Sequence, residues 1–287
     1  MLPLAITLGE PAGIGPDLTL IAWQRRRELD LPPFYLIGDP AFMADRAALL
    51  GLEVPIEAVR PGTASATFPD ALPVVPIDTV VTAAPGRPDK SSAPAAIAAI
   101  RSAVGDVLGG AASAVVTNPI AKSVLYRSGF AEPGHTEFLA TLTEEITGQS
   151  AQPVMMLWSP ELAVVPVTIH LPLNAVPTRL STRLIVDTGR IVARDLTNRF
   201  GRGHPRLAIA GLNPHAGEEG ALGEEDRTIV APAVEQLRRE GIDAHGPRPA
   251  DTMFHEAARA SYDAALCMYH DQALIPIRHW RSITPST

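Results

Sequence analysis

The stretch that decides the fold is Leu207-Ala-Ile-Ala-Gly-Leu-Asn-Pro-His-Ala-Gly-Glu-Glu-Gly220. Its first four residues are apolar and have the length of a buried strand. Glycine and proline residues then break the pattern, so the strand must end there. The strand therefore presents the imidazole of His215 and the carboxylates of Glu218 and Glu219 at its C-terminal end. In open α/β sheets, this is the end at which ligands bind.

Two other apolar runs end in the same way: Leu162–Ile169 leads to His170, and Ala264–Met268 leads to His270. A lone histidine at such a place is usually a surface or hydrogen-bonded residue, but here three of the eight histidines follow strand ends. Histidine is the commonest metal ligand, and three imidazoles leave coordination positions open. The separations, 215 − 170 = 45 and 270 − 215 = 55 residues, are too long for a zinc finger. They predict a catalytic divalent metal whose ligands His170, His215 and His270 come from neighbouring strands.

Predicted strands and helices alternate along the chain, which indicates an α/β fold with a largely parallel sheet. The 287 residues are 46% hydrophobic and 19% charged, so the chain can form one large or two modest domains with a sizeable core. No stretch rich in proline, glycine and serine divides the sequence. We therefore expect two closely joined lobes.

Charge and cysteine content limit the partners and the location of the protein. The formal net charge of −7 argues against nucleic acid or an anionic membrane surface as the main partner. The single cysteine, Cys267, lies in a predicted buried strand, which fits a reducing cytoplasm. The apolar N-terminus lacks the positive region of a signal peptide, and no apolar run is long enough to span a bilayer. We expect a cytoplasmic protein that binds small molecules.

Three places in the first half of the chain have features of anion sites. The glycine-rich turn Gly9–Asp17 leads from a strand into a helix, and it either holds a phosphate or is a tight turn. It matches neither the dinucleotide nor the P-loop pattern. Lys122 follows a strand end, where it either meets an anion or transfers protons, or is a solvated surface lysine. His135 and Thr136 begin a helix whose N-terminus favours a phosphate or carboxylate, while Thr136 alternatively serves as its N-cap.

Two aspartates complete the set of candidates. Asp251 precedes a short helix and is interpreted either as its N-cap or as a site carboxylate. Asp271 directly follows His270 at the end of a predicted strand.

Seven motifs, in this order, resemble the 4-hydroxythreonine-4-phosphate dehydrogenase family of pyridoxal phosphate biosynthesis, and they extend over nearly the whole chain. They are Gly-Glu-Pro-Ala-Gly-Ile-Gly-Pro at 9–16, Thr-Asn-Pro-Ile-Ala-Lys at 117–122, Gly-His-Thr-Glu-Phe at 134–138, Thr-Ile-His-Leu-Pro-Leu at 168–173, Gly-Leu-Asn-Pro-His-Ala-Gly-Glu at 211–218, Pro-Ala-Asp-Thr-Met-Phe at 249–254 and Met-Tyr-His-Asp-Gln at 268–272.

The resemblance implies a two-lobed fold like that of isocitrate and isopropylmalate dehydrogenases. We expect residues 1–130 and 268–287 in the first lobe, and residues 131–267, with a dimer interface, in the second. The resemblance also implies a homodimer with its active site at the subunit interface, and NAD, or alternatively NADP, as the oxidant. One divalent metal ion, zinc, magnesium or cobalt, is implied at the same three histidines.

The implied reaction is the oxidation of a small phosphorylated amino acid, 4-phosphooxy-L-threonine, at C3, followed by loss of CO2. The product is 3-amino-2-oxopropyl phosphate. His135 and Thr136 match the substrate-binding pair of the family. Lys122, Asp251 and Asp271 are candidates for proton transfer and for orienting the metal ligands.

The C-terminal part differs from the family pattern, which continues beyond the His-Asp-Gln motif with a lysine, a strand and closing helices. Arg278 stands where the lysine is expected, so we assign it to substrate binding. The tail at 279–287 shows no helical periodicity, and we expect a truncated chain with fewer partners for the substrate anions. Alternatives are an inactive homologue, a dehydrogenase of a related four-carbon phosphorylated acid, or a metal-dependent hydrolase with Glu218 as base.

Overall fold

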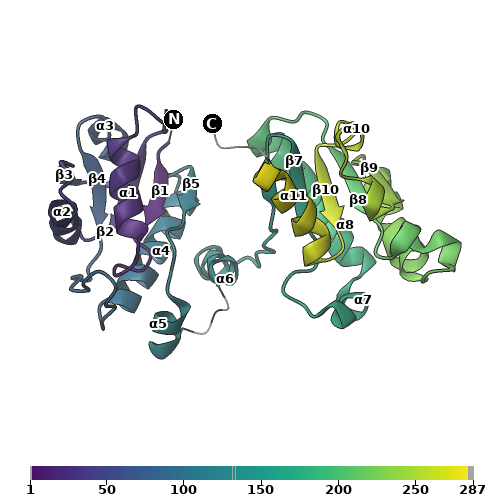
Figure 1. The fold of residues 1–287 in the computed structure, drawn as a ribbon, viewed down its shortest axis with the longest axis horizontal. Helices are drawn as coiled ribbons and strands as arrows, with labels where there is room; N and C mark the ends of the chain where they lie inside the picture. Colours follow the sequence, from purple (N-terminus) through teal and green to yellow (C-terminus); the bar gives the residue numbers. More distant parts are fainter. Residues whose placement is uncertain (1, 131, 133, 284–287) are drawn as a thin grey trace. The chain divides into compact units, whose positions relative to one another are not determined.

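The computed structural model of the protein describes residues 2–130, 132 and 134–283. The chain forms two compact units, Met1–Pro153 and Val154–Thr287 (Figure 1). Each unit contains its own five-stranded sheet with helices packed against it. The predicted α/β fold with largely parallel strands is confirmed, and the strands are shared between two sheets.

The first unit has the strand order β3-β4-β2-β1-β5, and every neighbouring pair is parallel. Its strands are β1 (Leu4–Thr7), β2 (Phe34–Gly38), β3 (Ile56–Ala58), β4 (Leu72–Pro76) and β5 (Ala114–Val116). Its helices are α1 (Gly15–Gln24), α2 (Pro40–Leu49), α3 (Ala64–Thr67), α4 (Ser92–Leu108), α5 (Lys122–Arg127) and α6 (His135–Thr147), with a 3-10 turn at Pro61–Thr63.

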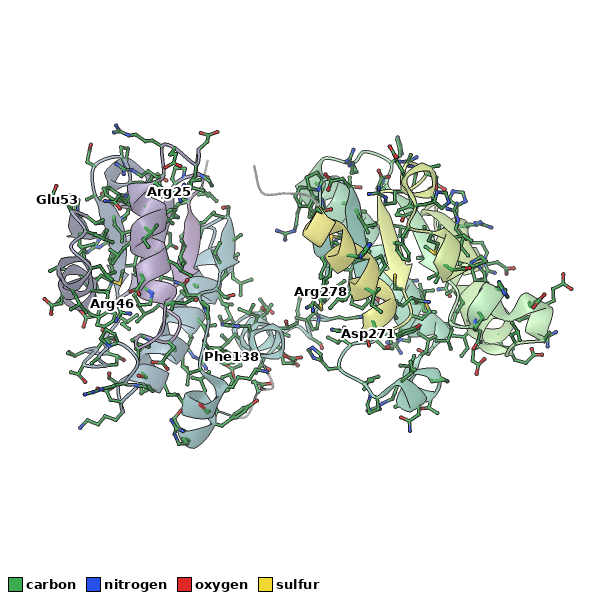
Figure 2. The ribbon with its side chains drawn as sticks, in the orientation of Figure 1. Arg25, Arg46, Glu53, Phe138, Asp271 and Arg278 are labelled. Carbon is green, nitrogen blue, oxygen red and sulfur yellow. The ribbon has the colours of Figure 1, made fainter. Side chains whose placement is uncertain are left out.

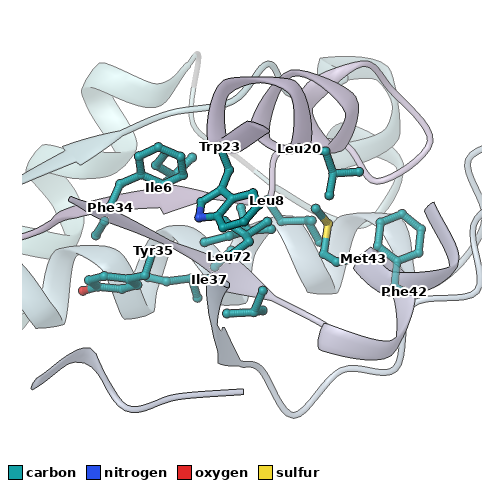
Figure 3. Close-up of a cluster of buried hydrophobic side chains, with 14 of the residues drawn as sticks. Ile6, Leu8, Leu20, Trp23, Phe34, Tyr35, Ile37, Phe42, Met43 and Leu72 are labelled. Atoms are coloured by element: carbon teal, nitrogen blue, oxygen red, sulfur yellow. The ribbon is translucent and has the colours of Figure 1, made fainter. Parts of the chain in front are cut away.

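Continuous burial of the central strand explains why the first unit folds as a parallel sheet. Every residue of β2 is buried, as expected for a strand covered by helices on both faces. Figure 3 shows Trp23 of α1 among the apolar side chains of this core, with Phe34 and Leu72. The Trp23 indole N–H donates to the carbonyl of Phe68 at 3.0 Å, so its one polar atom is satisfied although the ring is buried.

The glycine-rich turn at 9–17 packs tightly against the loop that follows β5. Gly9 has φ +70°, and a Cβ there would lie 2.6 Å from the Pro119 carbonyl oxygen and 2.7 Å from Asn118 Cβ. The buried Asn118 amide donates to the Thr7 carbonyl and to Thr19 Oγ1, both at 2.9 Å. Only glycine allows this approach. The contacts favour the tight-turn interpretation of the segment.

The second unit has the strand order β6-β7-β10-β8-β9. Its strands are β6 (Leu157–Ser159), β7 (Leu162–Pro166), β8 (Arg206–Ala210), β9 (Asp243–Arg248) and β10 (Ala264–Cys267). Its longer helices are α8 (Thr182–Phe200), α9 (Ala231–Arg239) and α11 (His270–Ile283), and the shorter ones are α7 (Val176–Arg179) and α10 (Glu256–Arg259). There are 3-10 turns at Leu173–Ala175, Pro214–Gly220 and Ala250–Thr252, and a π-turn at Asp226–Val230. Strands β6 and β7 form an antiparallel hairpin, and the remaining pairs are parallel.

The division of the chain differs from the expected lobes at two places. Helix α6 belongs to the first unit, because Phe138 and Leu142 bury against α4. Helix α11 belongs to the second unit, because Ala273, Leu274 and Ile277 form one buried helix face against its sheet. Helix α11 also continues to Ile283, into the tail whose sequence shows no helical periodicity. Residues 284–287 of the expected first lobe lie outside the described residues.

Candidate functional site

Three strands of the second sheet that are each followed by a candidate histidine end at the same edge of that sheet. Strands β7, β10 and β8 are adjacent and parallel, so their C-terminal ends lie side by side. His170 follows β7, His270 follows β10, and His215 follows β8. The arrangement is the one that the strand-end pattern predicts. Metal binding by these residues stays a prediction.

Two of the three imidazoles are spaced as ligands of one ion would be. The ring centroids of His170 and His270 are 5.9 Å apart. Two imidazoles that each bind one ion through a nitrogen at about 2.0–2.1 Å place their ring centres roughly 5–6 Å apart. Nδ1 of His270 also lies 2.9 Å from Oδ1 of Asp271. This carboxylate partner leaves Nε2 of His270 available, which is the usual arrangement of a metal-binding histidine.

His215 is not gathered with the other two imidazoles. Its side chain is exposed, and among the described residues no group of three histidine, cysteine, aspartate or glutamate side chains is arranged to hold an ion. His215 begins a left-handed turn that runs to Glu219, with φ between 44° and 81°. Such a backbone costs about 1–2 kcal/mol for each residue other than glycine, and residues held in this way cluster at functional sites.

A buried carboxylate holds the loop that carries His215. Asp226 is 1% exposed, and its oxygens accept from the backbone N–H of Leu212 at 2.7 Å and of Asn213 at 3.0 Å. The Asn213 amide donates to the same carboxylate at 3.1 Å. A Cβ on Gly211 would lie 2.9 Å from Oδ1 of Asp226, so glycine is required for this approach. Asp226 therefore fixes the start of the loop in place.

A pocket of about 430 Å³ opens beside His270. It is lined by polar residues, Thr168, Asp251, His270, Asp271 and Gln272, and by apolar ones that include Leu171, Phe254, Tyr269 and Ile275. Asp251 is not the N-cap of the short helix, because His255 occupies that position and accepts from the N–H of Ala258. The structure thus favours the interpretation of Asp251 as a site carboxylate.

Arg278 lies further along α11 than Asp271 (Figure 2). The two positions are seven residues apart in the helix, which corresponds to about 10 Å along the axis. Arg278 is exposed and is not among the residues that line the pocket. Its assignment to substrate binding stays a prediction.

The first unit contains a separate group of cationic and polar residues at the start of α6. The N-cap is Gly134 and no side chain caps the helix, so the alternative that Thr136 is the N-cap is wrong. A Cβ on Gly134 would lie 3.9 Å from Nζ of Lys122, which places that ammonium group beside the first turn. Thr136 is exposed. The backbone N–H groups of this first turn have no side-chain cap, and such groups favour an anion.

The surroundings of His135, which lies in the same turn, change the pKa of its imidazole. Burial, and then the positive charge of Lys122, lower the pKa of the His135 imidazole below 6.5. The ring is therefore neutral at neutral pH. Its Nε2 is buried and has no hydrogen-bond partner within the part of the chain that the structure describes. A neutral imidazole beside a lysine is suited to donate one hydrogen bond to a phosphate oxygen.

Because Lys122 lowers the pKa of His135, we expect the Lys122→Met variant to raise that pKa towards 6.5 without reaching it, since burial persists. Histidine NMR titration, assigned with His135→Gln, measures the shift. Lys90→Met is the matched control, because Lys90 is the only other lysine. The folded chain binds this proton less readily than the unfolded chain, so the contribution of His135 to stability is present above about pH 6.5 and falls as the pH is lowered. An unchanged pKa in Lys122→Met contradicts the assignment.

Comparison with known proteins gives the family of the chain. The family model of the pyridoxal phosphate biosynthetic protein PdxA matches residues 30–283. The chain belongs to this family. A 4-hydroxythreonine-4-phosphate dehydrogenase of Bradyrhizobium diazoefficiens is 63% identical, over 96% of this chain and 82% of that relative.

Solved structures agree with the family assignment. A 4-hydroxythreonine-4-phosphate dehydrogenase from Burkholderia phymatum has a TM-score of 0.86 at 30% identity, over 100% of this chain and 85% of that one. A terephthalate 1,2-cis-dihydrodiol dehydrogenase from Burkholderia xenovorans has a TM-score of 0.70 at 26% identity, over 97% of this chain and 82% of that one. The expected isocitrate/isopropylmalate dehydrogenase-like fold is confirmed. Within the described residues, no helix of this PdxA family member combines the length and apolar character needed to cross a membrane.

Proposed function

We propose that the chain is a dehydrogenase that oxidises 4-phosphooxy-L-threonine with NAD and one divalent metal ion, releasing CO2 and 3-amino-2-oxopropyl phosphate. One observation supports the proposal above all: His170, His215 and His270 each follow one of three adjacent parallel strands, at the same edge of the sheet. The relatives' names supply the substrate.

The donor set of the second unit suits a divalent ion. His170 and His270 would bind it through neutral imidazoles at the observed ring separation of 5.9 Å, with His215 as the third ligand. When bound, the ion supplies a Lewis acid that polarises the C3 oxygen of the substrate. Asp271 holds the proton on Nδ1 of His270 and so fixes the ring orientation.

Carboxylate and ammonium groups of this chain would transfer the protons of the reaction. Asp251 lines the same pocket as His270, where a carboxylate can accept the proton of the C3 hydroxyl. Lys122 is a candidate for returning a proton to carbon after CO2 leaves. His135 and Thr136 would hold the substrate's phosphate at the start of α6, and Arg278 would bind another substrate anion.

We also propose a homodimer with its active site at the subunit interface, acting in the cytoplasm. The family resemblance implies the dimer, and the free Cys267 in a buried strand fits a reducing cytoplasm. Light scattering coupled to gel filtration measures the oligomeric state. A monomer at micromolar concentration contradicts this part of the proposal.

The competing function is oxidation of a related four-carbon phosphorylated acid. The terephthalate 1,2-cis-dihydrodiol dehydrogenase at 26% identity is named for a different substrate, so the shared fold alone does not select the substrate. NADH formation with 4-phosphooxy-L-threonine and with a four-carbon phosphorylated hydroxy acid that lacks its amino group distinguishes the two. We expect turnover only with 4-phosphooxy-L-threonine, only with added Mg²⁺, Co²⁺ or Zn²⁺, and none after chelation. NADP replaces NAD in a parallel reaction.

Each remaining alternative has its own outcome in this assay. Product formation without any nicotinamide cofactor supports the hydrolase with Glu218 as base. A folded protein that binds the metal but gives no turnover with either nucleotide supports the inactive homologue. Both outcomes contradict the proposed dehydrogenase.

A further inference from the structure

Backbone pairing between β8 and β10 stops before the histidines are reached. The last paired residues in the parallel register are Ile209 and Leu266. Beyond them the two chains part, one towards His215 and the other towards His270. Some other contact must hold the two ends at a fixed distance if both imidazoles are to bind the same ion.

The side chain of Gln272 spans this gap. Its Oε1 accepts from the backbone N–H of Met268 at 2.6 Å, and its Nε2 donates to the carbonyl of Gly211 at 2.7 Å. The residue is 9% exposed, so both bonds are shielded from water. The amide group thus accepts a hydrogen bond from the end of β10 and donates one to the end of β8, so it continues the pairing of the two strands beyond their last backbone bonds.

The backbone of the same residue, Met268, is also tied to the third strand end through its carbonyl. Its carbonyl accepts from Oγ1 of Thr168 at 2.7 Å and from the Thr168 N–H at 3.3 Å. A continuous series of hydrogen bonds therefore runs from Thr168 through Met268 and Gln272 to Gly211. Thr168 lies two residues before His170, and Met268 lies two residues before His270.

We propose that Gln272 is a positioning residue that ties the strand end leading to His270 to the strand end leading to His215, and so limits how far the two imidazoles can separate when a metal ion binds. The inference rests on the proposed function as far as the metal is concerned. It explains why an amide is needed here. A carboxylate accepts from Met268 but cannot donate to Gly211, and an apolar chain of equal length does neither.

Three variants separate the positioning role from a general loss of stability. Gln272→Glu keeps the shape and the bond to Met268 but places a carboxylate against the Gly211 carbonyl. Gln272→Met removes both bonds. If Gln272→Met does not fold, the test is made with Gln272→Glu, which keeps one of the two bonds. The control is Ser159→Ala, because Ser159 is also buried and bonds twice to Leu162, but at the opposite edge of the same sheet.

Two measurements on the full chain test the proposal. Calorimetric titration with Co²⁺ gives the metal affinity, and hydrogen–deuterium exchange gives the protection of 211–220 and 264–272. We expect both Gln272 variants to bind Co²⁺ about 10–100-fold more weakly than the wild type and to exchange faster in these two segments. Ser159→Ala should leave both quantities unchanged.

Wild-type affinity in Gln272→Glu, or an equal loss in Ser159→Ala, overturns the proposal. If the wild type itself binds no Co²⁺, the metal assignment of the proposed function fails and exchange alone decides on Gln272. Faster exchange confined to the two segments then supports its tethering role, and unchanged exchange overturns it.

Discussion

The His215→Ala variant is expected to lose more than about 100-fold in affinity for a divalent ion, and with it the metal-dependent reduction of NAD, because a direct ligand matters more than its supporting partners. The loss should not come from unfolding. His215 is exposed, and the next residue in the turn, Ala216, already has a left-handed backbone with φ 53°, so alanine can adopt this conformation. Calorimetric titration with Co²⁺ and the NADH assay measure the two effects.

His204→Ala is the matched control for this experiment. His204 is also exposed and in the second unit, but it precedes β8, at the end of the strand opposite to His215. It should keep wild-type metal affinity and activity. Stoichiometric metal binding with full turnover in His215→Ala shows that the ligand assignment is wrong.

The Asp226→Ala variant is expected to lower the free energy of unfolding by about 3 kcal/mol, because two backbone N–H groups and the Asn213 amide lose their common buried acceptor. The left-handed turn at 215–219 would lose its anchor as well, so metal affinity should fall about 10-fold or more. Urea unfolding followed by circular dichroism measures the first effect, and Co²⁺ titration measures the second.

Glu225→Gln provides the comparison for Asp226. Glu225 is the neighbouring carboxylate and accepts from the Asn213 side chain at 2.9 Å, and no bond from Leu212 N–H or Asn213 N–H reaches it in the structure. We expect this variant to change stability by less than about 0.5 kcal/mol. Equal destabilisation by the two substitutions contradicts the specific role of Asp226.

Short-range patterns were sufficient to predict much of the second sheet. The apolar runs at 162–169, 207–210 and 264–268 correspond to β7, β8 and β10, and a polar loop follows each. The edge strand β9 was missed, because Asp-Ala-His-Gly-Pro-Arg at 243–248 has neither apolar alternation nor β-branched residues. Its strand conformation comes from pairing with β8, which is a tertiary contact.

The supporting residues of the candidate site could not be found in the same way. Gln272 lies in the same Met-Tyr-His-Asp-Gln motif as His270, but only its burial and its two bonds show what the amide does. Asp226 is one of many acidic residues between 218 and 226, and its sequence context gives no sign that it is buried. Both act on residues that are distant in the sequence.

For the loop at 211–220, the sequence alone determined that a buried strand ends there and carries His215, because strand burial and glycine or proline breaks are local properties. The order β7-β10-β8 was decided only by the tertiary structure, since neighbours in a parallel sheet are set by helical crossovers and long-range packing. The same is true of the left-handed turn and its anchor. Asp226 compensates for the cost of that backbone only after the chain has folded around it.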